Sequence, residues 1–381
     1  MQYLSNDLYR HYSVYCQKLK EKNLLRSLPS NNIANLIADF SHNDYLKMSK
    51  MLSVSNSSTH SGGSRLIQNL QIFSDLEAKI AKDKNFEDAM ILNSGFIGNA
   101  TVIAALLDKQ VLLAEPLVFA DKAVHSSIHL GIKIASAREV RYNHLDLDHL
   151  ESLLKGHEQH NNPKFIFSET IFSMDGDVLD IEKMVHIAKK YDAFLYLDEA
   201  HDIGVCGKNG YGLTQKYADQ IDVVLGSFSK ALGCFGGYIA CSSELKQYLI
   251  NKCSGFIYSS ALPPMIIDAA SKAWDAVRNL DQERDTINEH AKYLRNKLRI
   301  LGFNIGNSAS HIVPIILGSA TATMSLHKFL KENCILTAAI RPPSVAPSQS
   351  RLRVTICKEH TKDQLDYFLS LLIKYQHEAK L

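Results

Sequence analysis

The residues with the clearest chemical potential are an aspartate and a lysine, each placed just after a buried strand. Asp198 directly follows the apolar run Ala193–Leu197, where a carboxylate is poorly solvated unless a cationic group meets it. Lys230 follows the apolar run Val223–Leu225 and precedes a glycine-rich stretch. An apolar setting destabilises an ammonium ion, so a lysine there becomes a nucleophile. Taken singly, the two residues also fit a helix cap and a solvated surface charge.

Together the two residues match the arrangement that binds pyridoxal 5'-phosphate (PLP). In that arrangement a lysine bonds to the cofactor's aldehyde and an aspartate pairs with its ring nitrogen. The hydroxyls of Ser227 and Ser229, beside the lysine, can hold a phosphate. The segment Asn93-Ser94-Gly95-Phe96 precedes an expected helix, and backbone amides at a helix start bind phosphate. His201 can reach the same cavity as the aspartate.

Three short apolar strands and a helix have to position these groups. We expect the strands at Phe165–Phe167, Ala193–Leu197 and Val223–Leu225, and the helix at Ile181–Lys190. Continuously apolar strands separated by a helix favour a parallel sheet that is covered on both faces. Ligands of such sheets sit beyond the carboxyl ends of the strands, which is where Asp198 lies.

The pattern changes after about residue 264 and becomes typical of an α+β lobe. The elements expected there are a helix at Asp281–Ile300, a strand at Ile312–Leu317, a helix near Ala322–Lys331, and strands near Leu336–Ile340 and Leu352–Ile356. Residue pairs that cap helices predict three further starts: Ser74 with Glu77, Asp148 with Glu151, and Thr361 with Gln364. We therefore predict an amino-terminal segment (1–42), a large PLP-binding domain (43–263) and a small carboxy-terminal domain (264–381).

Composition and charge argue against several classes of partner. The chain has 42 basic and 40 acidic residues, a formal charge of +2, so neither a nucleic-acid backbone nor an anionic membrane is expected as its main partner. Charged residues interrupt the most apolar stretch, 101–120, and residues 1–10 lack the pattern of a signal peptide. The 7 cysteines are scattered and include no CxxC pair, which indicates a reduced, cytoplasmic protein. We expect no metal site.

Longer motifs, spread over nearly the whole chain, resemble those of the α-oxoamine synthases, a family of fold-type I PLP enzymes. These motifs are Asn43-Asp44-Tyr45-Leu46, Ser61-Gly62-Gly63-Ser64-Arg65, Ser94-Gly95-Phe96, Phe172-Ser173-Met174-Asp175-Gly176-Asp177, Asp198-Glu199-Ala200-His201, His311-Ile312-Val313-Pro314 and Ser350-Arg351-Leu352-Arg353. The segment Ile340-Arg341-Pro342-Pro343 is most similar to the family member that acts in biotin synthesis. The resemblance implies an α/β fold, with a mainly parallel sheet in the large domain and a smaller α+β domain.

The resemblance also implies catalytic roles. Lys230 would hold the cofactor and later move the Cα proton of the substrate. Asp198 would keep the ring nitrogen protonated, while His201 and Ser173 would contact the region of the phenolic oxygen. His125 would stack on the ring and orient the acyl substrate.

Binding roles follow from the same resemblance. Gly95, Phe96 and Ser227 would hold the phosphate. Ser260 would reach the phosphate bound by a second subunit, because the family's site lies at a dimer interface. Arg353 would grip the amino-acid carboxylate with two parallel hydrogen bonds. The remaining positions matched to substrate contacts are Arg26, Asn43 and Ser344.

The implied reaction is the PLP-dependent condensation of L-alanine with a pimeloyl thioester, which loses CO₂ and gives 8-amino-7-oxononanoate. The acyl carrier is coenzyme A or a carrier protein, and the expected assembly is a homodimer with a shared active site. Two departures from the family pattern leave the acyl substrate open. Segment 65–77 lacks the family's Ser-Gly and His, and Asp202 replaces a small residue. In addition, Ser227 stands where threonine is frequent.

Three other interpretations compete with this one. A sister α-oxoamine synthase would use glycine, serine or another acyl chain. A nucleotide-binding protein is suggested by residues 204–208, but they lack the spacing of a phosphate-binding loop. An inactive relative could serve only as a partner subunit, although such a protein has no chemical need for Lys230, Asp198, His201 and Arg353 together.

Overall fold

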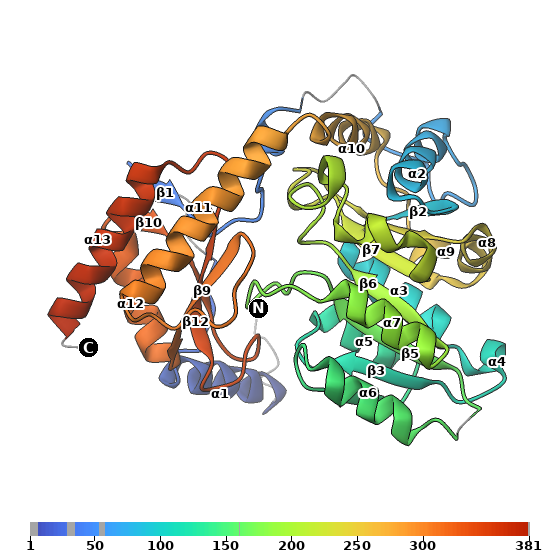
Figure 1. Cartoon of the computed structure of the whole chain (residues 1–381), viewed down its shortest axis with the longest axis horizontal. Helices are drawn as coiled ribbons and strands as arrows, with labels where there is room; N and C mark the ends of the chain where they lie inside the picture. Colours follow the sequence, from blue (N-terminus) through green and yellow to red (C-terminus); the bar gives the residue numbers. More distant parts are fainter. Residues whose placement is uncertain (1–6, 29–34, 53–57, 160, 380–381) are drawn as a thin grey trace. The chain divides into compact units, whose positions relative to one another are not determined.

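The computed structural model of the chain describes residues 7–28, 35–52, 58–159 and 161–379 (Figure 1). The chain forms two compact units. The large unit comprises the described parts of Asn43–Ser173 and Asp177–Ile287. The small unit comprises the described parts of Met1–His42 and Asn288–Leu381, together with Met174–Gly176. The domain boundaries expected from the sequence, at residues 42/43 and 263/264, stay a prediction.

The large unit is built on a seven-stranded sheet in the order β2-β8-β7-β6-β5-β3-β4. Its strands are β2 (Asp88–Leu92), β3 (Leu117–Asp121), β4 (Glu139–Tyr142), β5 (Lys164–Glu169), β6 (Ala193–Asp198), β7 (Val223–Ser227) and β8 (Gly237–Cys241). Strand β8 runs antiparallel to both of its neighbours, β2 and β7, and the other neighbouring pairs of this sheet are parallel. The predicted α/β class and the mainly parallel sheet are therefore confirmed, and each of the three predicted strands lies within an observed one.

Helices cover both faces of this sheet. Successive residues of a strand alternate between two apolar cores: Phe165 and Phe167 belong to one, and Ile166 belongs to the other. The helices of the first core are α3 (Gly95–Leu106), α5 (Ser126–Ile134), α8 (Ser243–Lys252) and α9 (Ser254–Ile257). Those of the second are α6 (Leu147–Gly156) and α7 (Ile181–Lys190), and the latter matches its predicted range. Burial on both faces explains why the strands are apolar throughout.

Two predicted helix starts are wrong because the capping side chains have other partners. Helix α2 (Gln71–Lys84) begins before Ser74, because the carboxylate of Glu77 pairs with Arg65 and accepts the backbone N–H of Ile91 at 2.7 Å instead of folding back. Helix α6 is capped by Asp146, not by Asp148. The remaining elements of the large unit are α4 (Lys109–Leu112), α10 (Pro264–Val277), the start of α11 (Asp281–Ile300), and short 3-10 helices at Met48–Lys50, Lys208–Gly210 and Leu213–Gln220.

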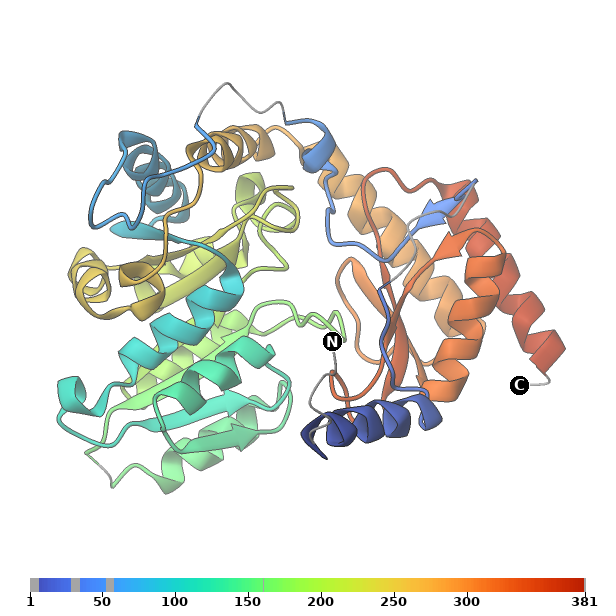
Figure 2. The same cartoon turned by 180° about the vertical axis from the view of Figure 1, so that it is seen from behind.

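The small unit holds an antiparallel sheet in the order β11-β12-β9 and a parallel pair, β1 with β10. Figures 1 and 2 show from opposite sides that α12 lies between this sheet and α13. The elements are α1 (Asp7–Glu21), β1 (Ala38–Asp39), β9 (Ile312–Gly318), α12 (Ala320–Glu332), β10 (Ile335–Leu336), β11 (Ala338–Ile340), β12 (Ser350–Thr355) and α13 (Lys362–Ala379), with the rest of α11. The α+β arrangement, the range of α11 and the Thr361–Gln364 cap of α13 are confirmed.

The single strand predicted near Leu336–Ile340 is two strands in the structure. Leu336 pairs with Asp39 of β1, whereas Ala338 pairs with Arg353 of β12. The chain changes sheets at Thr337, and local sequence gives no sign of that change because both halves are equally apolar. No helix in the described ranges combines the length and the apolar character needed to cross a membrane.

A partly buried histidine ties the end of β3 to the segment after Ser173. His144 lies 3.0 Å from the carboxylate of Asp121 through Nδ1 and 3.0 Å from that of Asp177 through Nε2. Burial by itself would lower the pKa of His144, but the hydrogen bonds to both carboxylates outweigh it and raise the pKa to about 10. His144 is therefore a cation at neutral pH.

We predict a stability difference between two glycine substitutions. An added Cβ at Gly131 of α5 would lie 2.8 Å from the backbone oxygen of Asn99 in α3, whereas one at Gly156 would meet nothing within 4 Å. Gly131→Ala should lower the free energy of unfolding by about 1–3 kcal/mol. Gly156→Ala should leave it unchanged or raise it by up to ~1 kcal/mol. Urea denaturation measures both; equal stability of the Gly131→Ala protein and its parent would contradict the close α3–α5 packing.

We also predict that the stabilisation by His144 fades as pH rises. A histidine whose folded-state pKa is raised stabilises the fold fully below its ordinary pKa of 6.5, and the effect is lost as pH rises toward about 10. The difference in unfolding free energy between the parent and His144→Gln should therefore shrink by at most about 1.4 kcal/mol per pH unit in that window. His186→Gln, on the exposed face of α7, is the control; a pH-independent difference for His144→Gln would refute the interpretation.

Candidate active site

Three parallel strands of the large unit end in polar residues at one edge of the sheet. In the register, Glu169 at the end of β5 lies beside Asp198 at the end of β6. Asp198 in turn pairs with Leu225 of β7, which ends at Ser227. A cavity of about 320 Å³ opens at this edge. It is lined by Ser94, Gly95, Phe96, Asn99, His125, Glu169, Asp198, Ala200, His201, Leu225, Ser227, Ser229 and Lys230.

The carboxylate of Asp198 is held by donors on both of its oxygens. Asn99 Nδ2 donates to Oδ2 at 2.7 Å, and the backbone N–H of Ala200 donates to Oδ1 at 2.9 Å. Asn99 is itself oriented by the hydroxyl of Tyr196, which donates to Asn99 Oδ1 at 2.8 Å. Sequence reasoning missed Asn99, although a single amide in an otherwise apolar helix was a usable signal. A carboxylate fixed in this way can meet a protonated ring nitrogen.

Hydroxyls and helix amides gather on the far side of the cavity. Ser227 Oγ lies 2.8 Å from Ser229 Oγ, and an added Cβ at Gly95 would lie 3.6 Å from the Cβ of Ser227. Gly95 begins α3, whose first amides have no acceptor inside the helix, and Ser94 caps it by accepting the N–H of Ile97 at 3.1 Å. This donor set fits a phosphate. Because Asp198 and Lys230 line the same cavity, the residues present fit PLP as a whole.

His125 and Glu169 form the wall above Asp198. The backbone N–H of His125 donates to the carboxyl group of Glu169, and the ring of His125 packs edge-on to that of Phe96 at 6.1 Å. Partial burial lowers the pKa of His125, although the nearby Asp198 opposes that shift. Burial and the charge of Asp198 raise the pKa of Glu169 well above its usual range. Both shifts favour the uncharged form of the side chain. Sequence reasoning missed Glu169, a polar residue that ends an apolar strand.

The side chain of His201 contacts Tyr45, which lies near the first residues of the large unit. The hydroxyl of Tyr45 lies 2.6 Å from His201 Nδ1 and 3.4 Å from Asn43 Oδ1. The structure thus connects the predicted residues Asn43 and His201 through a tyrosine that the sequence analysis did not assign. Ser173 is buried but is not among the residues that line the cavity. Ser260, also outside that lining, is exposed.

Three predicted substrate residues belong to the small unit. Arg26 Nη2 donates to Ser344 Oγ at 3.3 Å and approaches the backbone oxygen of Pro342 at 3.5 Å. Arg353 is buried on β12, where its backbone pairs with Ala338 of β11. The structure therefore brings Arg26 and Ser344 together, and the roles of all three residues stay predictions.

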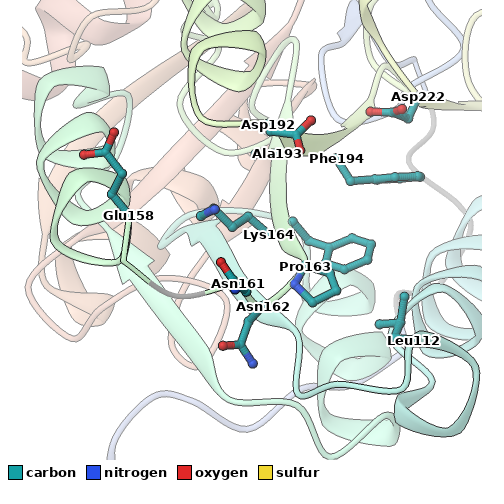
Figure 3. Close-up of a pocket in the computed structure, with 11 residues that line it drawn as sticks. Leu112, Glu158, Asn161, Asn162, Pro163, Lys164, Asp192, Ala193, Phe194 and Asp222 are labelled. Carbon is teal, nitrogen blue, oxygen red and sulfur yellow. The ribbon is translucent and has the colours of Figure 1, made fainter.

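A second hollow of about 660 Å³ lies at the opposite edge of the large sheet (Figure 3). Lys164, Ala193 and Asp222 line it, at or just before the amino ends of β5, β6 and β7. None of the predicted site residues lines this hollow. Ligands of parallel sheets bind at the carboxyl ends, so the first cavity is the candidate site. Within the described ranges, no three His, Cys, Asp or Glu side chains are grouped as metal ligands would be.

Comparison with known proteins identifies the family. Residues 37–372 match the family model described as aminotransferase class I and II. A relative from Paramagnetospirillum magneticum is 46% identical over 346 residues, which cover 88% of each chain. A relative from Magnetococcus marinus is 40% identical over 370 residues, 92% of this chain and 94% of that one. Both carry the name "Putative 8-amino-7-oxononanoate synthase".

Solved structures agree with this assignment. The 8-amino-7-oxononanoate synthase from Francisella tularensis is 27% identical, with a TM-score of 0.77 over 91% of this chain and 99% of that one. A serine palmitoyltransferase from S. paucimobilis, 22% identical, has a TM-score of 0.86 over 98% of both chains and shows the shared fold. The chain therefore belongs to the aminotransferase class I and II family and, within it, to the α-oxoamine synthases, which are PLP-dependent enzymes that transfer acyl groups.

Proposed function

We propose that this enzyme condenses L-alanine with a pimeloyl thioester to give 8-amino-7-oxononanoate. A bond forms between the alanine Cα and the thioester carbonyl carbon, the carbon–sulfur bond breaks and releases the carrier thiol, and the former alanine carboxylate leaves as CO₂. The observation that carries the proposal is the grouping of Asp198, Lys230 and a phosphate-binding donor set around one cavity. The names of the relatives that are 46% and 40% identical support the choice of substrates.

PLP, when bound, supplies an electron sink for the carbanion that the condensation needs. We assign its ring nitrogen to Asp198, its phosphate to Ser227 and the first amides of α3, and its aldehyde to Lys230. The amine of Lys230 would take the Cα proton of alanine and would return a proton to the same carbon after CO₂ has left. The uncharged imidazole of His125 orients the acyl group. Arg353 holds the alanine carboxylate until that carboxylate is released.

Two neighbouring guanidinium groups in the small unit support an acyl chain that ends in a carboxylate. Arg341 Nη1 donates to the backbone oxygen of Asn23, while its buried Nε has no hydrogen-bond partner within the described residues. Burial and the positive charge of Arg26 both lower the pKa of Arg341, so the two side chains repel one another. An anion placed between them would relieve that repulsion. This favours pimeloyl over a plain fatty acyl chain, which is what a palmitoyltransferase would use.

We also propose a homodimer and a cytoplasmic location. Ile67, Phe96 and Tyr258 of the large unit are large apolar side chains that are 83%, 45% and 85% exposed. A second copy of the chain would cover such a surface and bring its Ser260 to the phosphate. The 7 cysteines are all free thiols, as expected in a reducing compartment.

Substitution of the proposed cofactor lysine tests the reaction directly. Lys230→Ala should fold, with an unchanged melting temperature, but should lose product formation by at least about a thousandfold, because no other group in the site replaces its amine as covalent holder and base. Mass spectrometry of the product from alanine and pimeloyl-CoA, run beside glycine, serine and palmitoyl-CoA, measures both activity and specificity. Normal turnover by the Lys230→Ala protein, or a parent enzyme that prefers palmitoyl-CoA, would reject the proposal.

Loss of Arg26 should affect acyl binding more than turnover. Arg26→Gln should raise KM for pimeloyl-CoA by about tenfold or more, the size expected when a charged hydrogen bond is lost, and should change kcat much less. Lys328→Gln is the matched control, because its side chain is 76% exposed on α12 of the same unit. Equal KM values for the two variants would show that Arg26 does not bind the acyl chain.

A further inference from the structure

A closed ionic network lies beside the candidate site, and the chemistry proposed above does not use it. Lys84 is the last residue of α2, and Glu199 directly follows Asp198 at the end of β6. Thr214 and Tyr238 complete the network from a 3-10 helix and from β8. The side chains of Lys84 and Glu199 are 0% exposed. Removing a lysine and a glutamate completely from water costs free energy, so other interactions have to offset that cost.

Every polar atom of this ion pair has a partner. Lys84 Nζ donates to Glu199 Oε2 at 2.6 Å, to the backbone oxygen of Tyr211 at 2.7 Å and to Thr214 Oγ1 at 2.7 Å. Thr214 Oγ1 donates to the same carboxylate oxygen at 2.6 Å. Tyr238 Oη donates to the other oxygen, Oε1, at 2.8 Å. Each of the three protons of the Lys84 ammonium group therefore has an acceptor, and none remains for a further hydrogen bond.

Two glycines make the network sterically possible. An added Cβ at Gly212 would lie 2.5 Å from Glu199 Oε2 and 3.0 Å from Lys84 Nζ, and its φ of +85° also disfavours a side chain. An added Cβ at Gly226 would lie 2.2 Å from the ring of Tyr238, which crosses that residue to reach the carboxylate. Because Gly226 and Tyr238 are paired across β7 and β8, the glycine opens the path for the tyrosine.

The network anchors the turn that carries two of the proposed cofactor contacts. Glu199 stands between Asp198 and His201, and its backbone N–H donates to the oxygen of Leu225 at 2.8 Å. The carbonyl oxygen of Glu199 accepts the N–H of Asp202 at 3.0 Å, which closes the turn after the strand. With its side chain tied to α2 and β8 as well, Glu199 is fixed at its amide, its carbonyl and its carboxylate. Asp198 precedes this fixed residue by one position, and His201 follows it by two.

A second buried carboxyl group nearby leaves the ion pair intact. Asp202 Oδ2 accepts the N–H of Leu213 at 3.2 Å, while Oδ1 has no partner among the described residues. Burial and the charge of Glu199 raise the pKa of Asp202 well above its usual range. All three protons of Lys84 are engaged by Glu199, Tyr211 and Thr214, so Asp202 does not compete for the lysine.

We propose that Lys84 and Glu199 are positioning residues, whose buried ion pair, closed by Thr214 and Tyr238, holds the turn 198–203 so that Asp198 and His201 face the cavity. This inference rests on the roles given to Asp198 and His201 under the proposed function. It adds that helix α2, which contributes no residue to the cavity lining, controls the geometry at the cofactor ring through a single salt bridge.

The test removes both charges together, because a single substitution would leave an unpaired buried charge. The variant Lys84→Met/Glu199→Gln should fold and should bind PLP about tenfold more weakly than the parent. The pH midpoint of its visible cofactor absorbance should shift by about one unit. In the protein without cofactor, hydrogen exchange across residues 198–203 should be faster. The control is Lys79→Met/Asp275→Asn, which removes an exposed pair, 2.6 Å apart, between the same helix α2 and helix α10; we expect it to change none of these.

Two further variants keep the outcomes separable. Tyr238→Phe removes one hydrogen bond to Glu199 and leaves both charges in place. It should also weaken PLP binding, by about threefold. If the double variant does not fold, this result tests the positioning role. Asp198→Asn tests the underlying role. Unchanged absorbance and PLP binding in Asp198→Asn would overturn the proposed function. A clear effect there, with parental values for the folded double variant and for Tyr238→Phe, would overturn the positioning role alone.

Discussion

A carboxylate buried at the end of a parallel strand needs donors, and the candidate site is organised around that need. Asp198 is 6% exposed and receives one hydrogen bond from helix α3 and one from its own turn. The same helix begins with the amides of Gly95 and Phe96, across from Ser227. One helix would therefore contact both ends of the proposed cofactor: its first turn supplies the amides assigned to the phosphate, and its second turn supplies Asn99, which holds Asp198.

Charge is distributed so that the cavity carries few competing groups. Glu169 lines the cavity, and burial beside the charge of Asp198 raises its pKa well above the usual range, which favours its uncharged form. The carboxylate of Glu199, the next acid along the chain, pairs with Lys84 at 2.6 Å and is not part of the cavity lining. Two adjacent carboxylates of one motif thus have separate environments. In the proposed site, Asp198 would meet the cofactor and Glu199 would fix the backbone on which Asp198 depends.

The departures of this chain from its family fall where the structure gives them local partners. Arg65, in the altered segment, pairs with Glu77 and lies over the rings of Phe73 and Phe256, at 4.7 Å and 5.3 Å from their centroids. Asp202 fits as a neutral acid behind an ion pair that is already complete. Both of these departures are accommodated within the large unit and lie outside the cavity lining, whereas the third departure, Ser227, is itself one of the residues that line the cavity.

The sequence by itself determined the main strands of the large sheet and indicated the candidate reacting groups, Asp198 and Lys230, whose roles stay predictions. Uninterrupted apolar strands predict a covered parallel sheet, and its carboxyl edge predicts where Asp198 meets its ligand, because these patterns depend only on neighbouring residues. Tertiary structure alone decided which partner each polar group takes. Asn99 reaches Asp198 across 99 positions of the chain, Arg26 reaches Ser344 across 318, and Glu77 leaves its expected cap. Hydrogen bonds and ion pairs are formed by groups that folding brings within about 3 Å of one another. The local pattern of apolar and polar residues does not predict which distant groups will meet.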